Sequence, residues 1–149
     1  MFAHLGENVT IQKRAIVGFR YRKGCRRARI GDNSIIRAFT VIYADVEIGC
    51  DLQTGHHALI REFTNIGNGV VVGSGTIIDG QTVIGDLVKI ESRVYIPAHT
   101  RIGNRVFIGP GVVMTNDRYP QRLRSAYQPQ GPVLQDGVSV GANVTILPG

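Results

Sequence analysis

The sequence predicts an all-β protein, wound as a single-stranded, three-sided solenoid of short parallel strands. The main observation is an apolar residue at every sixth position from residue 30 to residue 114, with no slip of register and Thr54 as the only polar member. A second series of small or β-branched residues runs four positions behind it, from Ser34 to Val112. Self-similarity at a short fixed period is typical of repeat architectures. We therefore expect both series to point into one continuous core.

A period of six excludes the simpler alternatives. Amphipathic helices have a period of 3.6 residues, and hairpins would need a regular two-residue turn signal that the sequence lacks. Three six-residue sides give a coil of about 18 residues, and coils stack at a strand spacing of about 4.8 Å. We expect about six triangular coils. Glycine often follows the first series, and we expect it to supply the backbone angles of the corners: Gly31, Gly49, Gly55, Gly67, Gly73, Gly85, Gly103 and Gly109.

Two segments interrupt this single domain of residues 1–149. The first, a basic insertion at residues 18–29, bulges from a corner and contains Arg20, Arg22, Lys23, Arg26, Arg27 and Arg29. It is either a solvated loop or a phosphate-binding arm, because arginine forks match phosphate oxygens. The second, an extended external loop at residues 115–133, contains three of the six prolines. Loops of this length in compact folds are more often functional than passive. The repeat resumes at Leu134.

Composition narrows the function classes. The formal net charge of +6 suits a polyanionic small molecule. Nucleic acid is disfavoured as a partner because the charges are not interleaved with stacking aromatic residues along the repeat. No window is long and apolar enough for membrane insertion. Cys25 and Cys50 lack a metal-ligand spacing and are expected to be reduced thiols in the cytoplasm.

The pattern Ile-Gly-x-x-Val-x resembles the repeat of the hexapeptide-repeat acyltransferases. The resemblance covers nearly the whole chain and implies a left-handed parallel β-helix, although ordinary parallel crossovers are right-handed. It also implies a homotrimer with three sites between neighbouring helices, the long loop of one subunit covering the next. Residues 146–149 look like the middle of the family's pattern, so the chain is either truncated at its C-terminal end or ends its solenoid early.

The start of the long loop, residues 112–120, resembles the Thr-Asn-x-x-x-Pro segment of nucleotide-sugar N-acetyltransferases. This resemblance implies transfer of an acetyl group from acetyl-CoA to an amino group of a nucleotide-linked sugar, for surface glycan synthesis. It aligns Ser92 and Arg93 with a polar pair near the amine, although the family's Asn is not retained, and it places the coenzyme near Gly109, Gly141 and Ala142. Arg118 and Tyr119 are expected to bind the sugar nucleotide. Tyr119 stands where galactoside-type O-acetyltransferases have a catalytic His.

Stacking arithmetic adds candidate catalytic residues. Residues eighteen apart should lie above one another, so His99 is expected one rung from Asp117, as a base held by a carboxylate. Asn116 could hydrogen-bond the acceptor. His56 and His57 lie on a different corner, where they could hold or deprotonate the acceptor. The alternatives are a merely solvated His on each corner, and an Asx-turn at the start of the loop.

The chemistry needs few parts: an amine attacks the thioester carbonyl, donors stabilise the oxyanion, and a group accepts a proton. O-acetylation of a sugar or other small molecule is the nearest alternative. A gamma-class carbonic anhydrase-like zinc enzyme would need three His at an interface. Adjacent His56 and His57 point apart on a strand corner, so we expect no metal. A non-catalytic trimeric scaffold is the third alternative.

Overall fold

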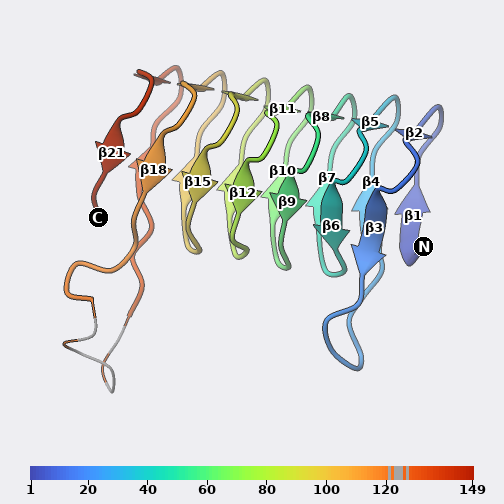
Figure 1. Ribbon diagram of the computed structural model, residues 1–149, viewed down its shortest axis with the longest axis horizontal. Coiled ribbons are helices and arrows are strands. Elements are labelled where there is room, and N and C mark those ends of the chain that lie inside the picture. Colours follow the sequence, from blue (N-terminus) through green and yellow to red (C-terminus); the bar gives the residue numbers. More distant parts are fainter. Residues whose placement is uncertain (121, 123–125, 127) are drawn as a thin grey trace.

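The computed structural model describes residues 1–120, 122, 126 and 128–149. They form a three-sided prism in which each wall is a parallel sheet of seven short strands (Figure 1). Strands in one wall are usually eighteen residues apart, as in the pairing of Ile60 with Ile78 and of Ile78 with Ile96. Successive rungs therefore superpose the columns that the repeat predicts.

The three walls are called sheets A, B and C. Sheet A contains β1 (Ala3–Leu5), β4 (Ala28–Ile30), β7 (Glu47–Ile48), β10 (Asn65–Ile66), β13 (Val83–Ile84), β16 (Arg101–Ile102) and β19 (Val133–Leu134). Sheet B contains β2 (Thr10–Ile11), β5 (Ile35–Ile36), β8 (Gln53–Thr54), β11 (Val71–Val72), β14 (Lys89–Ile90), β17 (Phe107–Ile108) and β20 (Ser139–Val140). Sheet C contains β3 (Ile16–Phe19), β6 (Val41–Tyr43), β9 (Leu59–Ile60), β12 (Ile77–Ile78), β15 (Tyr95–Ile96), β18 (Val113–Met114) and β21 (Thr145–Ile146).

Both predicted series are buried along their whole length, and together they form one core. Ile36, Ile42, Ile60, Ile78 and Ile90 are completely excluded from solvent. The expectation of about six coils was too low, because the described residues form seven rungs. The additional rung arises because residues 3–19 already form one strand of each sheet, so that Leu5 pairs with Ile30 across the basic insertion.

The predicted role of the glycines is wrong. Gly49 and Gly67, which follow the first series, have ordinary φ angles, whereas left-handed φ angles occur two residues later, as at His57 and Phe63. Gly67 is needed for close stacking instead, because an added Cβ would lie 2.8 Å from the carbonyl carbon of Gly85. The left-handed corner positions are thus occupied by residues of many types. Glycine recurs instead where neighbouring rungs stack too closely for a side chain.

The corners are named by the sheets they join. Both insertions interrupt the corner from sheet C to sheet A, called corner CA: residues 20–27 form an arm between β3 and β4, and residues 115–132 form the long loop between β18 and β19. Figure 1 shows the arm and the long loop extending from the same side of the prism. Residues from the two ends of the chain therefore gather along one edge.

Candidate functional site

The outer face of sheet C is apolar over six successive rungs. Its outward-facing residues form one column: Ile16, Val41, Leu59, Ile77, Tyr95 and Val113. Ile16 and Val113 are 48% and 41% exposed. The four residues between them are half-buried. The corresponding column of sheet A, in contrast, includes Arg29, Glu47, Asn65 and Arg101. Large apolar patches on a protein surface are typical of interaction sites.

Most of the predicted substrate and coenzyme residues lie along the edge of this face at the corner from sheet B to sheet C, called corner BC. The backbone there stacks as predicted: Gly75 N donates to His56 O, Arg93 N to Ser74 O, and Gly111 N to Ser92 O, at 2.9–3.0 Å. Gly109 packs directly under Ala142, whose backbone N would lie 2.7 Å from an added Cβ. Corner BC therefore holds His56, His57, Ser92, Arg93, Gly109, Gly141 and Ala142 in one strip.

Aromatic stacking fixes His57 on this corner. Its ring lies on Phe39, with centroids 4.7 Å apart and planes inclined by 3°. The Arg14 guanidinium covers Phe39 at 5.6 Å. All three residues have left-handed φ angles between 57° and 70°, which place their side chains one above another along the edge. His56, in contrast, is exposed, and its backbone N donates to Ser74 Oγ at 3.1 Å.

The predicted catalytic residues at the start of the loop lie at corner CA, across sheet C. His99 is exposed and stacks above Gln81, whose carbonyl accepts its N–H at 3.1 Å. The Asn116 side chain donates to the carbonyl of Ala98 at 3.1 Å, eighteen residues below it. The loop returns to the same point, where Gln130 N donates to Asn116 O and an added Cβ on Gly131 would lie 2.7 Å from His99 O.

The His99–Asp117 pair does not form in this chain. No hydrogen bond or ion pair joins the two residues in the part of the chain that the structure describes. Asp117 Oδ1 instead accepts the N–H of Tyr119 at 2.8 Å, which is the Asx-turn alternative. The eighteen-residue stacking holds as far as Asn116. The position above His99 is then occupied by Gly131, near the end of the loop. Arg118 and Tyr119 lie beyond Asn116 and are exposed.

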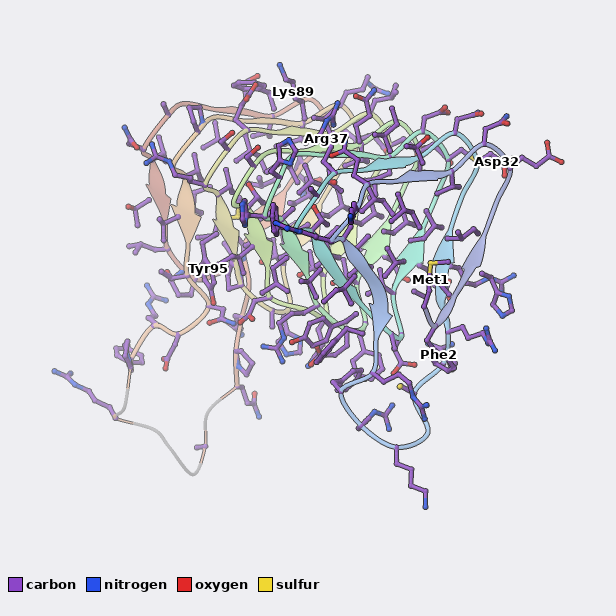
Figure 2. All side chains as sticks on the ribbon, turned by 45° about the vertical axis from the view of Figure 1, so that its right-hand side comes forward. Met1, Phe2, Asp32, Arg37, Lys89 and Tyr95 are labelled. Carbon is purple, nitrogen blue, oxygen red and sulfur yellow. The ribbon has the colours of Figure 1, made fainter. Side chains whose placement is uncertain are left out.

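An ion-pair network one to two rungs below His99 was not predicted. Arg61 bonds Asp79 at 2.9 Å and Glu62 at 2.8 Å, and Tyr95 Oη donates to Asp79 at 3.1 Å. The hydrogen bonds from Arg61 to Glu62 and then to Asp79 raise the pKa of its guanidinium. Figure 2 shows Tyr95 towards the side from which the long loop extends, away from Lys89 at the top.

The sequence does contain a signal for this network. At corners BC and AB, the residue after the first series is frequently Gly, but at corner CA this column reads Tyr43, Arg61, Asp79, Pro97 and Thr115. At this corner the column therefore carries side chains that can form contacts on the surface of the prism. Searching each wall separately would have identified corner CA as the distinctive edge.

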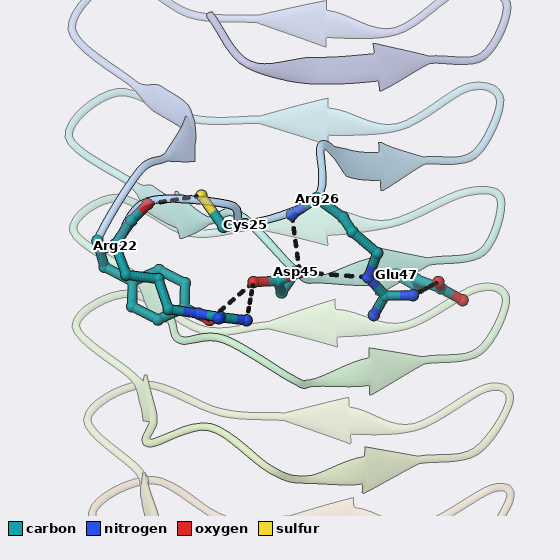
Figure 3. Close-up of polar contacts among 6 residues, drawn as sticks. Arg22, Cys25, Arg26, Asp45 and Glu47 are labelled. Carbon is teal, nitrogen blue, oxygen red and sulfur yellow. Dashed lines mark hydrogen bonds and ion pairs between the residues drawn. The ribbon is translucent and has the colours of Figure 1, made fainter.

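Lower on the same corner, the buried carboxylate of Asp45 fixes the basic arm (Figure 3). Its Oδ1 accepts Arg26 N at 2.9 Å and Arg26 Nε at 3.2 Å, and its Oδ2 accepts Tyr21 Oη at 2.7 Å. Burial disfavours the carboxylate, but these hydrogen bonds and Arg22 outweigh that effect and lower the pKa of Asp45. Burial raises the pKa of Tyr21.

The predicted residues thus form two groups, which border opposite edges of the apolar face of sheet C. The side of the prism from His57 to Phe63 is six residues long, which at about 3.3 Å per residue places its ends up to about 20 Å apart. Within one chain, His57 and His99 lie on corners at opposite edges of sheet C, with the width of the sheet between them. Two chains that pack through sheet C could place one edge of each chain against the opposite edge of the other.

Within the described residues, no group of three or more His, Cys, Asp or Glu side chains could hold a metal ion. No helix in that part of the chain has the length and apolarity to span a bilayer. Cys25 and Cys50 are free thiols, and Cys25 donates to Arg22 O at 3.4 Å.

Three walls of parallel strands around a six-residue repeat define this chain as a left-handed parallel β-helix. The family model described as bacterial transferase hexapeptide (six repeats) matches residues 81–116 of the chain. This confirms the resemblance inferred from the repeat pattern. The matched segment includes Ser92, Arg93, His99 and Asn116. No curated protein sequence matches the chain significantly.

Two solved structures share the fold. One is UDP-N-acetylglucosamine O-acyltransferase (LpxA) from Moraxella catarrhalis RH4, with 21% identity over 97% of this chain and 65% of that one, and a TM-score of 0.55. The other is the UDP-N-acetylglucosamine acyltransferase of Francisella novicida, with 18% identity over 97% and 54% of the two chains, and a TM-score of 0.65. The chain spans less than two-thirds of each. At these identities the similarity establishes the fold alone.

Proposed function

We propose that this chain is an acyltransferase that moves an acyl group from a thioester onto a nucleotide-linked sugar. The observation that carries the proposal is the hexapeptide transferase repeat at residues 81–116, because it contains part of the candidate set on both corners: Ser92, Arg93, His99, Gly109 and Asn116. The names of the two structural neighbours support a sugar nucleotide as the acceptor. Within this class, we propose acetyl-CoA as the donor and a sugar amine as the acceptor, in cytoplasmic synthesis of a surface glycan.

The proposed enzyme is a homotrimer whose sites lie between subunits. The apolar column on sheet C supports this assembly, since the trimer would cover six rungs of exposed or half-buried side chains. The separation of His57 from His99 within one chain supports it too. Each site would take His99, Asn116 and the start of the long loop from one subunit, and the strip of corner BC from its neighbour.

His99 is the proposed general base. Its imidazole is exposed and makes no hydrogen bond with the described residues, so both ring nitrogens can meet a substrate. As the amine nitrogen bonds to the thioester carbonyl carbon, His99 would accept its proton. Collapse of the tetrahedral intermediate breaks the C–S bond, and the leaving sulfur would take the proton held by His99 and depart as the thiol. The Asp117 carboxylate accepts the N–H of Tyr119 in the Asx-turn. It would therefore contact the substrate, together with Arg118 and Tyr119, and would not hydrogen-bond His99.

Corner BC suits the donor. Gly141 is exposed, and an added Cβ there would meet only Val144, at 3.9 Å, so the backbone is open to a ligand. The neighbouring Ala142 has only a methyl side chain, so it does not block access to this backbone, and Gly109 lies one rung below. The exposed Arg93 supplies positive charge for a phosphorylated coenzyme. Ser92 and the pair His56–His57 would contact the acceptor.

Thiol release tests the proposal. Acetyl-CoA is mixed with the protein and a panel of UDP- and dTDP-linked amino sugars, and free thiol is measured over time. Release that requires both donor and amino sugar is the expected result. Matching sugars with a hydroxyl in place of the amine test O-acylation, which the name of the Moraxella neighbour favours as second candidate. No release with any donor and acceptor pair, and no shift in melting temperature with CoA, would favour a scaffold.

A further inference from the structure

A pocket lies between the arm and the outer face of sheet A, at the other end of the molecule from the long loop. It encloses about 330 Å³, and its lining includes His4, Arg26, Arg27, Arg29, Asp45 and Glu47. The basic residues of the lining come from three elements: His4 and Arg29 are paired neighbours on β1 and β4, and Arg26 and Arg27 belong to the arm. Cationic side chains therefore converge on one concavity.

The charge of the chain is concentrated in this segment. Residues 18–29 contain six of the 17 Lys and Arg residues and no Asp or Glu. The remaining 11 Lys and Arg balance the 11 Asp and Glu, so the whole formal charge of +6 resides in the arm and its base. A local excess of this kind attracts anions.

The two acidic residues in the lining, Asp45 and Glu47, do not neutralise this positive charge. Both carboxylate oxygens of Asp45 are occupied by the arm, through Arg26, Tyr21 and Arg22 (Figure 3). Glu47 approaches Arg26 at 3.9 Å. Asp45 thus fixes the arm and presents no lone carboxylate to a ligand.

Two arginines remain for a ligand. Among the described residues, no carboxylate pairs with Arg27 or Arg29. The Arg27 guanidinium lies 5.0 Å from the centre of the Phe2 ring, which restrains it through a cation–π contact. Arg29 projects from β4 between the buried Ala28 and Ile30, so the strand fixes the point from which its exposed side chain extends. Two placed and unpaired guanidinium forks can each take one phosphate group in a bidentate manner.

We propose that this pocket, called the arm pocket, binds a small anion with two linked phosphates, such as pyrophosphate or the diphosphate of a nucleotide. The pocket is concave and its cations come from three elements, which favours a small molecule over a flat membrane surface. Asp45 lies three rungs below His99 in one corner column, about 14 Å away at strand spacing. The arm pocket is therefore distinct from the proposed acyl-transfer site and does not depend on that activity.

Titration calorimetry with pyrophosphate tests the proposal. We expect pyrophosphate and UDP to bind at least tenfold more tightly than orthophosphate, because only they engage both arginines. In the double variant Arg27→Gln/Arg29→Gln, we expect pyrophosphate affinity to fall at least tenfold. Arg101→Gln is the matched control, since Arg101 occupies the Arg29 column of sheet A four rungs away. We expect the control to bind as the unsubstituted protein does.

The substituted side chains are exposed, so equal melting temperatures would show that the variants fold. The proposal would be overturned by undiminished pyrophosphate affinity in the double variant, or by an equal loss in Arg101→Gln. Equal affinity for orthophosphate and pyrophosphate would show that the pocket does not recognise a second phosphate, and would overturn the proposal of a diphosphate ligand. Binding to phosphatidylglycerol vesicles or to DNA, without binding of pyrophosphate or UDP, would assign the cations to a macromolecular surface instead.

Discussion

Asp45 and Arg26 are joined by reciprocal hydrogen bonds, one to the Asp45 side chain and one between the backbones. Arg26 N donates to Asp45 Oδ1 at 2.9 Å, and Asp45 N donates to Arg26 O at 3.0 Å. The Asp45 side chain is only 1% exposed, whereas that of Arg26 is 70% exposed. A buried carboxylate on the solenoid thus holds a protruding arm that has almost no core of its own.

Replacing this carboxylate should destabilise the protein in a pH-dependent way. Burial opposes ionisation of Asp45, but the hydrogen bonds from Arg26 and Tyr21 outweigh it and lower the pKa of this carboxyl. Its contribution is therefore complete above the unfolded-state pKa of about 3.9 and is lost as pH falls below it. We expect Asp45→Asn to lower the free energy of unfolding by about 1–3 kcal/mol at pH 7. The difference from the unsubstituted protein should shrink between pH 5 and pH 3. Urea unfolding at a series of pH values measures it.

Asp51→Asn is the control for charge alone. Asp51 is exposed, with a left-handed φ of 60° that Asn accepts readily. We expect its free energy of unfolding to stay within about 0.5 kcal/mol of the unsubstituted value. A pH-independent effect of Asp45→Asn would show that packing, and not the carboxylate, anchors the arm.

A charge on sheet C should dissociate the proposed trimer. Ile77, Val71 and Val83 are outward residues of neighbouring strands β12, β11 and β13, one on each wall. We expect Ile77→Arg to give monomers and to reduce thiol release at least tenfold, because each proposed site needs two chains. Val71→Arg and Val83→Arg place the same charge on sheets B and A and should remain trimeric. Sedimentation velocity distinguishes these states.

The interface would be assigned to another wall if Val83→Arg or Val71→Arg dissociated the protein while Ile77→Arg did not. If the unsubstituted protein sediments as a monomer at every concentration, the site between subunits is excluded. The prediction uses only outward positions, so it leaves the buried core unchanged.

Loss of the His99 imidazole should slow the acyl transfer itself. We choose His99→Asn because His99 has a φ of 67°, and Asn tolerates this conformation better than most residues. General-base catalysis contributes about 10²–10⁴-fold, so we expect kcat to fall by at least about 100-fold with KM for acetyl-CoA little changed. The measurement is steady-state thiol release between pH 6 and pH 9.

Gln81→Asn provides the comparison one rung below, again at a left-handed φ of 45°. It should keep most of the activity. Equal rates for His99→Asn and the unsubstituted protein would exclude His99 as the base and redirect attention to His57 across the sheet.

The sequence alone is sufficient to predict the core, because a buried column needs an apolar residue at each rung and the period reveals it. From Ile30 to Met114 every predicted inward position is buried, including the polar Thr54. The Thr54 hydroxyl shares a hydrogen bond of 3.2 Å with the Thr40 hydroxyl, and its oxygen accepts the N–H of Arg37 at 2.9 Å. The exception to the apolar series is thus accommodated by local hydrogen bonds.

The site was less predictable, since period arithmetic ends where the chain leaves the solenoid. The eighteen-residue spacing still holds at Asn116, whose side chain donates to Ala98 O, but Asp117 turns back on the Tyr119 N–H, and Gly131 near the end of the loop packs on His99. The length of an insertion does not determine where its residues return. The network around Arg61 depends on side-chain reach between columns, which a one-dimensional repeat does not encode.

Thr64 offers a test of core polarity. Its buried Oγ1 has no hydrogen-bond partner among the described residues, whereas Thr82, one rung above, donates to Gly80 O at 2.8 Å. We expect Thr64→Val to increase the free energy of unfolding by about 1 kcal/mol, because an unsatisfied hydroxyl is removed at constant shape. Thr82→Val should decrease it by about 1 kcal/mol. Urea unfolding compares the two, and loss of stability in both variants would show that Thr64 is satisfied by water.

Leu87 tests the energetic cost of the left-handed corners. It has a φ of 56° and is 61% exposed, so its side chain gains little from burial while its backbone is held in a conformation that disfavours branched residues. We expect Leu87→Asn to raise the free energy of unfolding by about 0.5–1 kcal/mol, since Asn enters this region at lower cost. Leu87→Val should lower it, because β-branching crowds the backbone further. Urea midpoints measure both. A Val variant as stable as the Asn variant would mean that contacts between corners, and not backbone preference, select the residue at each turn of the prism.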